Sequence, residues 1–166
     1  AAALLGPNLP IAVRAAAGER DARRDVAMGA LLAGVAFGST GTHLCHALQY
    51  PLGALTKTPH GLGTGLLLPY VLDALRLGGS ADRVAQFGAA LCGDASAEGA
   101  RDRVAEINRA IGVPSTLAEI GVTRGQLPRI AELALASKRL IAIAPIEPTA
   151  EALLHILERA HEGAFS

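Results

Sequence analysis

Apolar residues recur along the chain at helical spacing, and nowhere do they alternate with polar residues over a useful length. The stretch closest to a strand pattern, residues 140–144, is too short to count. We therefore predict an all-α fold in a single domain over residues 1–166. The spacing predicts about eight helices, at residues 8–17, 19–38, 42–50, 60–77, 81–91, 95–111, 127–136 and 149–161.

Several helix boundaries are predicted from single residues. Asn8 is expected to cap the first helix and Gly18 to end it. Pro51 is expected to end the third helix, because a proline pushes the residue before it out of the α region. Asp94 is expected to cap the helix at residues 95–111. These boundaries place the turns between the predicted helices.

Residues 26–37, VAMGALLAGVAF, are apolar on almost every side of their predicted helix. A helix of that kind is usually buried, so we predict that this one is covered in the folded protein. The run is too short to cross a bilayer, which takes about 20 apolar residues. We therefore expect no membrane partner.

Composition points to a packed, nearly neutral protein. Hydrophobic residues make up 51% of the chain and aromatic residues only 3%, so a core of Ala, Leu, Ile and Val in closely packed helices is expected. The formal net charge is +0, which gives no basic excess for binding nucleic acid. The two cysteines, Cys45 and Cys92, lack the spacing of a metal or redox motif, which favours a reduced pair in the cytoplasm.

Two histidines, His46 and His60, are the strongest candidates for chemistry. They lie fourteen residues apart among Ala, Leu and Gly, where a buried imidazole needs a partner. Pro51 and Pro59 stand between them and require the chain to turn, so that both rings can approach one point. Converging imidazoles commonly hold a divalent metal, but two ligands do not complete a site. The alternative is a pair of core histidines with ordinary hydrogen bonds.

A motif around these histidines carries a resemblance to a known family. Residues 46–75 read HALQYPLGALTKTPHGLGTGLLLPYVLDAL, with Pro-Leu-Gly after the first histidine and Pro-His-Gly around the second. This segment resembles the metal-binding segment of the iron-containing alcohol dehydrogenases, in the dehydroquinate synthase-like superfamily. Residues 112–135 and the Asn-Leu-Pro at residues 8–10 are also similar to that family, so the resemblance covers nearly the whole chain.

The resemblance implies a two-domain oxidoreductase that interconverts an alcohol and a carbonyl. An upstream α/β domain would bind NAD(P), and a helical domain, represented by residues 1–166, would hold Fe²⁺ or Zn²⁺. His46 and His60 match two of the four metal ligands, while an Asp and a His would come from upstream. The implied partners are a small alcohol, aldehyde or oxo-acid, the nucleotide-binding domain and, in some members, a second subunit. We expect the chain to be part of a longer protein and to be inactive alone.

Tyr50 departs from the family pattern. Many members have a histidine at this position, near the nicotinamide, where it assists proton transfer. Tyr50 can donate a hydrogen bond, but a phenol titrates near pH 10 and relays protons poorly at neutral pH. The His-Leu-Cys-His run at residues 43–46 and the Tyr-Pro step are similar to the hydroxyacid–oxoacid transhydrogenases, which is one alternative. The other is a helical interaction or oligomerisation module without catalysis.

Overall fold

The computed structural model describes residues 1–14 and 19–165, and within these residues the fold is helical without strands. The longer helices are α1 (Ala2–Arg14), α2 (Arg20–Thr40), α3 (Leu44–Thr56), α4 (His60–Leu75), α5 (Ala81–Cys92), α6 (Ala97–Ile111), α7 (Leu127–Leu135) and α9 (Ala150–Glu162). A π-helical turn (Arg76–Ser80), two 3₁₀ turns (Ala118–Ile120 and Arg124–Gln126) and the short α8 (Lys138–Ile141) complete them. The all-α prediction is confirmed.

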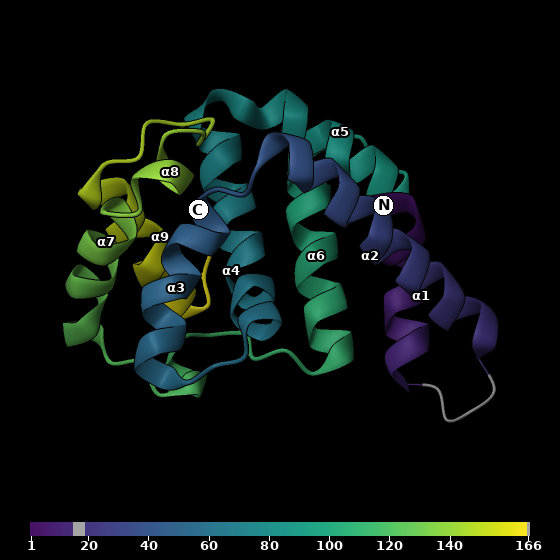
Figure 1. Ribbon diagram of the computed structural model, residues 1–166, viewed down its shortest axis with the longest axis horizontal. Coiled ribbons are helices and arrows are strands. Elements are labelled where there is room, and N and C mark those ends of the chain that lie inside the picture. Colours follow the sequence, from purple (N-terminus) through teal and green to yellow (C-terminus); the bar gives the residue numbers. More distant parts are fainter. Residues whose placement is uncertain (15–18, 166) are drawn as a thin grey trace.

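The helices pack in pairs from one end of the molecule to the other. Helix α1 pairs with α2 at one end and also packs against α5 and α6 (Figure 1). Helix α4 packs against α3, α6 and α9, which places it in the middle. Helix α7 packs against α3 and α9 at the opposite end. The α3–α4 pair is therefore supported on both sides.

The core of the described residues is built from aliphatic side chains, as composition predicts. Tyr70 is the one aromatic residue among its buried members, and its hydroxyl donates to the Ser115 carbonyl at 2.6 Å. The largest fully buried side chains are Leu44, Leu48, Leu52, Leu66, Leu67, Leu117, Leu127, Leu153, Ile156, Leu157 and Val71. Most of them lie on α3, α4 and α9, directly beneath the segment that carries the histidines.

A buried carboxylate links α4 to α6. Asp73 is 4% exposed, and its Oδ1 accepts hydrogen bonds from Arg76 and Arg101, each at 2.8 Å. The Arg101 guanidinium also lies over the Phe165 ring, 4.8 Å from its centroid. A charge this deeply buried is tolerated only with close partners, so this cluster fixes how α4 and α6 are aligned.

The prediction that Pro51 ends a helix is wrong, because α3 continues through it to Thr56. An interior proline costs a helix about 3 kcal/mol. Leu48 and Leu52 are both fully buried, and each contributes about 2 kcal/mol, which together offset that cost. The helix ends instead at Lys57, whose φ is 59° and whose N–H bonds to the Gly53 carbonyl at 2.9 Å.

Two capping predictions are also wrong. Asn8 lies inside α1, where its side-chain amide donates to the Leu4 carbonyl at 2.9 Å, because the helix begins at Ala2. Helix α6 begins at Ala97 and is capped by Ser96, whose Oγ accepts from the Gly99 N–H at 2.9 Å. Asp94 instead accepts from the Ser96 N–H. The predicted helix end at residues 15–17 and the stop at Gly18 lie outside the described residues.

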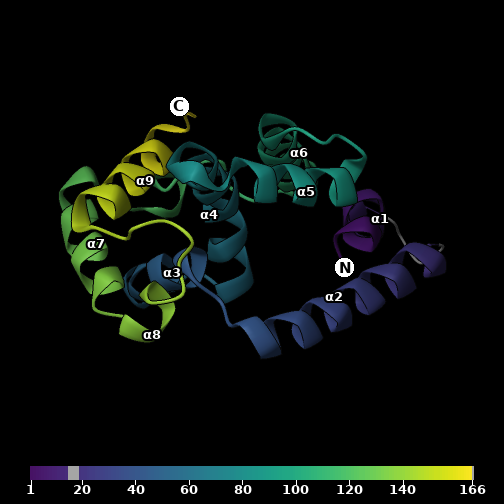
Figure 2. The same cartoon turned by 90° about the horizontal axis from the view of Figure 1, so that it is seen from above.

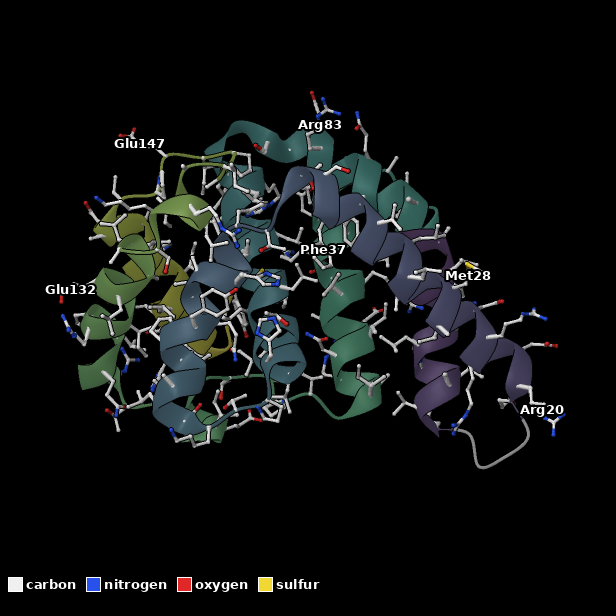
Figure 3. All side chains as sticks on the ribbon, in the orientation of Figure 1. Arg20, Met28, Phe37, Arg83, Glu132 and Glu147 are labelled. Atoms are coloured by element: carbon white, nitrogen blue, oxygen red, sulfur yellow. The ribbon has the colours of Figure 1, made fainter. Side chains whose placement is uncertain are left out.

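The prediction that residues 26–37 are buried is wrong within the described structure. Helix α2 packs mainly against α1, where a Cβ at Gly29 would lie 2.8 Å from Leu5 Cγ, and it runs along one edge of the molecule (Figure 2). Its remaining apolar side chains stay exposed because no described residue covers them. This exposed α2 face consists of Met28, Leu31, Leu32 and Val35, of which Figure 3 labels Met28. Phe37, also labelled there, is exposed on another side of the helix.

Among the residues that the structure describes, none of the helices is both long and apolar enough to span a membrane.

Candidate metal centre

The turn between α3 and α4 brings the two predicted histidines together. His46 lies in the first turn of α3, and His60 is the first residue of α4. The centroids of their imidazole rings are 5.0 Å apart, with the ring planes inclined at 58°. His46 is half-buried and His60 is exposed, so both rings remain accessible from outside the core. The expected convergence is present, while the ligand role of the two residues stays a prediction.

Tyr50 lies beside both histidines. It follows His46 by one helical turn on α3, and residues four apart share a helix face. Its ring centroid is 6.5 Å from that of His46 and 6.1 Å from that of His60. The side chain is exposed, as expected of a group that would face a cofactor or substrate. Its catalytic role stays a prediction.

A buried amide fills the space between α3 and α4. Gln49 is 2% exposed, and its Nε2 lies 3.5 Å from the Thr58 carbonyl in the turn before His60. Two glycines make room for it: a Cβ at Gly53 would lie 2.8 Å from Gln49 Nε2, and a Cβ at Gly63 would overlap Oε1. The hydroxyls of Thr56 and Thr58 are hydrogen-bonded to each other across the turn. These contacts fix the spacing of the two imidazoles.

The two histidines and Tyr50 open into one cavity of about 500 Å³. Its walls come from the end of α2, the loop that follows it, α3, the start of α4, and α8 with the turn after it. The lining residues are Phe37, Gly38, Gly41, Thr42, His46, Tyr50, His60, Arg139, Leu140 and Ile143. Sequence reasoning did not select Arg139 or Ile143, because only the tertiary fold brings α8 to this cavity.

The surroundings of His46 and His43 favour their neutral forms. Burial lowers the pKa of His46, and the positive charges of His60 and His43 lower it further. Burial also lowers the pKa of His43, whose Nδ1 is buried without a hydrogen-bond partner. A neutral imidazole has the lone pair that a metal requires. Burial raises the pKa of the Cys45 thiol to about 12, which keeps that sulfur protonated and unsuited to ligation.

His46 and His60 fit the role of two ligands in a metal site that needs further ligands. The imidazoles of His46 and His60 line one cavity, and imidazole nitrogens are suitable ligands for Fe²⁺ or Zn²⁺. No cluster of three or more His, Cys, Asp or Glu side chains able to hold a metal occurs in the described part of the chain.

The chain is similar in sequence to several alcohol and aldehyde oxidoreductases. It is 34% identical to lactaldehyde reductase of Escherichia coli (strain K12) over 125 residues, which are 72% of this chain and 33% of that protein. It is 35% identical to long-chain-alcohol dehydrogenase 1 of Geobacillus thermodenitrificans over 155 residues, 89% of this chain and 38% of that protein. The chain thus spans about a third of the length of these relatives.

Solved structures agree with the sequence matches. An iron-containing alcohol dehydrogenase from Thermococcus thioreducens superposes with a TM-score of 0.84 at 29% identity, over 98% of this chain and 42% of that one. The maleylacetate reductase of Rhizobium sp. strain MTP-10005 gives a TM-score of 0.80 at 29% identity, over 99% and 44%. The model of the C-terminal part of the Fe-containing alcohol dehydrogenase family matches residues 1–161. The chain belongs to the Fe-containing alcohol dehydrogenase family and represents its helical C-terminal domain.

Proposed function

We propose that the protein containing this chain is a metal-dependent oxidoreductase that interconverts an alcohol and a carbonyl with NAD(P). His46 and His60 would supply two of its metal ligands. The observation that carries the proposal is the pair of imidazoles, 5.0 Å apart, facing one open cavity. The nucleotide-binding domain and the remaining ligands would lie upstream, since the relatives are about three times as long as the matched region. We place the protein in the cytoplasm.

Several residues of the cavity have a role in this scheme. When bound, a divalent iron or zinc ion supplies Lewis acidity toward the oxygen of the alcohol or carbonyl. Neutral His46 and His60 donate nitrogen lone pairs and add no negative charge, so the positive charge at the site is preserved. Phe37 and Ile143 give the cavity apolar surface against which the carbon chain of a substrate would pack.

Tyr50 would orient the substrate or the nicotinamide through its hydroxyl. It lies about 6 Å from His60, on the cavity side of α3. The phenolic O–H of Tyr50 would donate a hydrogen bond there, a role that does not require it to take a proton from the alcohol. Proton release would then use water or a group from another part of the protein.

Replacing either histidine tests the proposal. In the intact protein, His46→Ala or His60→Ala should reduce tightly bound iron or zinc at least about tenfold, because each removes a ligand. Elemental analysis of the purified protein measures the content. His155→Ala is the matched control, since His155 lies on α9 and does not line the cavity. Unchanged metal content in both cavity variants would overturn the ligand assignment.

One observation favours a second candidate, a helical interaction module. The exposed α2 face presents four large apolar side chains, and contiguous apolar surface commonly marks a contact with another protein segment. This candidate needs no metal, so intact protein without iron or zinc but with stable self-association would favour it. The hydroxyacid–oxoacid transhydrogenases remain the alternative enzyme class; they differ from the leading proposal in using a hydroxy acid as the hydride donor.

A further inference from the structure

The cavity that contains the two histidines also contains a cation for which the described residues provide no counterion. Arg139, on α8, contributes to the lining, and no Asp or Glu does so. The other titratable lining residues are His46, Tyr50 and His60. Any divalent metal would add to the positive charge of this wall. The described residues therefore leave the cavity with an excess of positive charge.

The Arg139 guanidinium is available to bind a ligand that enters the cavity. Its side chain is exposed and makes no hydrogen bond or ion pair with any described residue. By contrast, Arg76 and Arg101 are held by Asp73 in the buried cluster between α4 and α6. A guanidinium carries five N–H donors in a planar fork, which matches the two oxygens of a carboxylate.

The backbone around Arg139 is fixed, so the side chain starts from a defined position on the cavity wall. The next residue, Leu140, is 4% exposed and anchors α8 in the core. The turn after α8 packs against the end of α2, where a Cβ at Gly41 would lie 2.7 Å from Ile143 Cδ1. Gly41 has a φ of 79°, so its lack of a side chain permits both the turn and this close contact.

We propose that Arg139 binds the carboxylate of the substrate, which makes the substrate a small hydroxy acid or oxo acid and not a simple alcohol. The inference rests on the proposed function, and it deepens it by assigning the substrate class. The carboxylate pairs with Arg139, while the hydroxyl or carbonyl oxygen faces the two histidines. An uncharged alcohol of the same chain length fits the cavity but leaves the guanidinium unpaired.

Binding measurements on the intact, metal-loaded protein without nucleotide test this directly. The probes are glycolate, 3-hydroxypropanoate and 4-hydroxybutanoate, each compared with the alcohol of equal carbon number. Calorimetry should show at least one acid binding more tightly than its alcohol. Arg139→Gln should weaken that acid about 10- to 100-fold, as expected for a lost hydrogen bond between ions, and leave the alcohol within about twofold. If no acid binds better than its alcohol, the inference is overturned.

Two further variants separate charge from structure. Arg139→Lys should keep part of the preference for the acid, since lysine retains the positive charge but lacks the planar pair of N–H donors. Lys138→Ala removes the neighbouring cation on α8. Lys138 does not line the cavity, so this variant should leave the affinities for acid and alcohol unchanged. Equal weakening of acid and alcohol by Arg139→Gln would mean that Arg139 supports the fold or contacts another domain, which overturns the inference.

Turnover distinguishes failure of this inference from failure of the proposed function. With NAD(P) present, Arg139→Gln should raise KM for the acid about 10- to 100-fold and leave KM for the nucleotide unchanged. A raised KM for the nucleotide instead assigns Arg139 to the cofactor and overturns the inference. If the protein holds metal and oxidises alcohols with no preference for acids, the proposed function stands and the inference fails. If it holds no metal, the proposed function fails, whatever Arg139 binds.

Discussion

Tyr70 illustrates how the environment of one residue sets its response to pH. Its ring lies 5.1 Å from that of Phe165, centroid to centroid, and its hydroxyl donates to the Ser115 carbonyl. Burial raises the pKa of Tyr70, and the negative charge of Glu119 raises it further. The folded protein therefore holds this proton at a pH where the unfolded chain has begun to release it.

The sign of the stability change follows from that difference. An unfolded tyrosine releases its proton near pH 10, and the folded state does so at a higher pH. The free energy of unfolding should therefore fall as pH rises from about 9 to 11, since the unfolded state binds fewer protons there. Tyr70→Phe should lose about 1 kcal/mol at pH 7 and then show a shallower decline. Urea unfolding at pH 7 and pH 10.5 measures both. Equal declines in the two proteins would contradict the burial argument.

The histidine pair is the residue-scale feature that the sequence predicted best. Pro51, Gly53 and Pro59 between the two residues indicated a turn, but only Pro59 lies at it, because Pro51 and Gly53 are inside α3. Contacts within one short segment are set mainly by local geometry. Arg139 could not be found in that way. It lies 79 residues after His60, on a four-residue helix without a periodic signal, and reaches the cavity only through tertiary packing.

At the scale of elements, the α3–α4 pair depends on glycine in α4. Gly63 faces the buried Gln49 amide, while Gly61, one half-turn earlier, has nothing within 4 Å of where a Cβ would stand. The two glycines thus differ in surroundings although they share a helix. Their comparison isolates the effect of the packing between α3 and α4.

Gly63→Ala should destabilise the protein by about 1–3 kcal/mol, because the new methyl group overlaps the Gln49 side chain. Gly61→Ala, the matched control, should be neutral or stabilise by up to about 1 kcal/mol through its greater helix propensity. Adding Gln49→Ala to Gly63→Ala should recover part of the loss by freeing space. Chemical denaturation of the three variants measures these changes, and equal effects of the two glycine substitutions would refute the packing argument.

Element boundaries show where local rules were overridden. Pro51 is a strong stop signal, yet the burial of Leu48 and Leu52 on one face keeps α3 helical to Thr56. Helix α2 was placed correctly to within about two residues, at Arg20–Thr40 against the predicted 19–38. The exposure of α2 was not predicted correctly, because periodicity identifies an apolar helix face but does not show whether another element covers it.

At the scale of the whole molecule, the exposed α2 face is the largest departure from expectation. Leu31 and Val35, one helical turn apart, are 61% and 66% exposed, and the helix packs mainly against α1 alone. Surface of this kind associates with other apolar surface in water.

The 166-residue chain alone should therefore bind a hydrophobic dye and associate as its concentration rises. The Leu31→Glu and Val35→Glu double variant should reduce both effects, with little loss of folding stability because the side chains are already exposed. Leu133→Glu is the matched control, since Leu133 is 42% exposed on α7, away from this face. Dye fluorescence and sedimentation velocity report the outcome. If the wild-type chain remains monomeric and binds no dye, the exposed α2 face does not drive association, which would contradict the prediction.

The placement of His46 and His60 on one continuous segment has a mechanical consequence. Their separation is set by a single turn braced by Gln49, so rotation of one part of a larger enzyme against another would leave it unchanged. Because both histidines belong to the α3–α4 segment, they would move as one unit. Rotation of that segment away from another domain would increase the distance from both imidazoles to any ligands on that domain at the same time. If the two histidines ligate a metal as proposed, metal exchange would depend on that rotation, and the residence time of the metal would report on it.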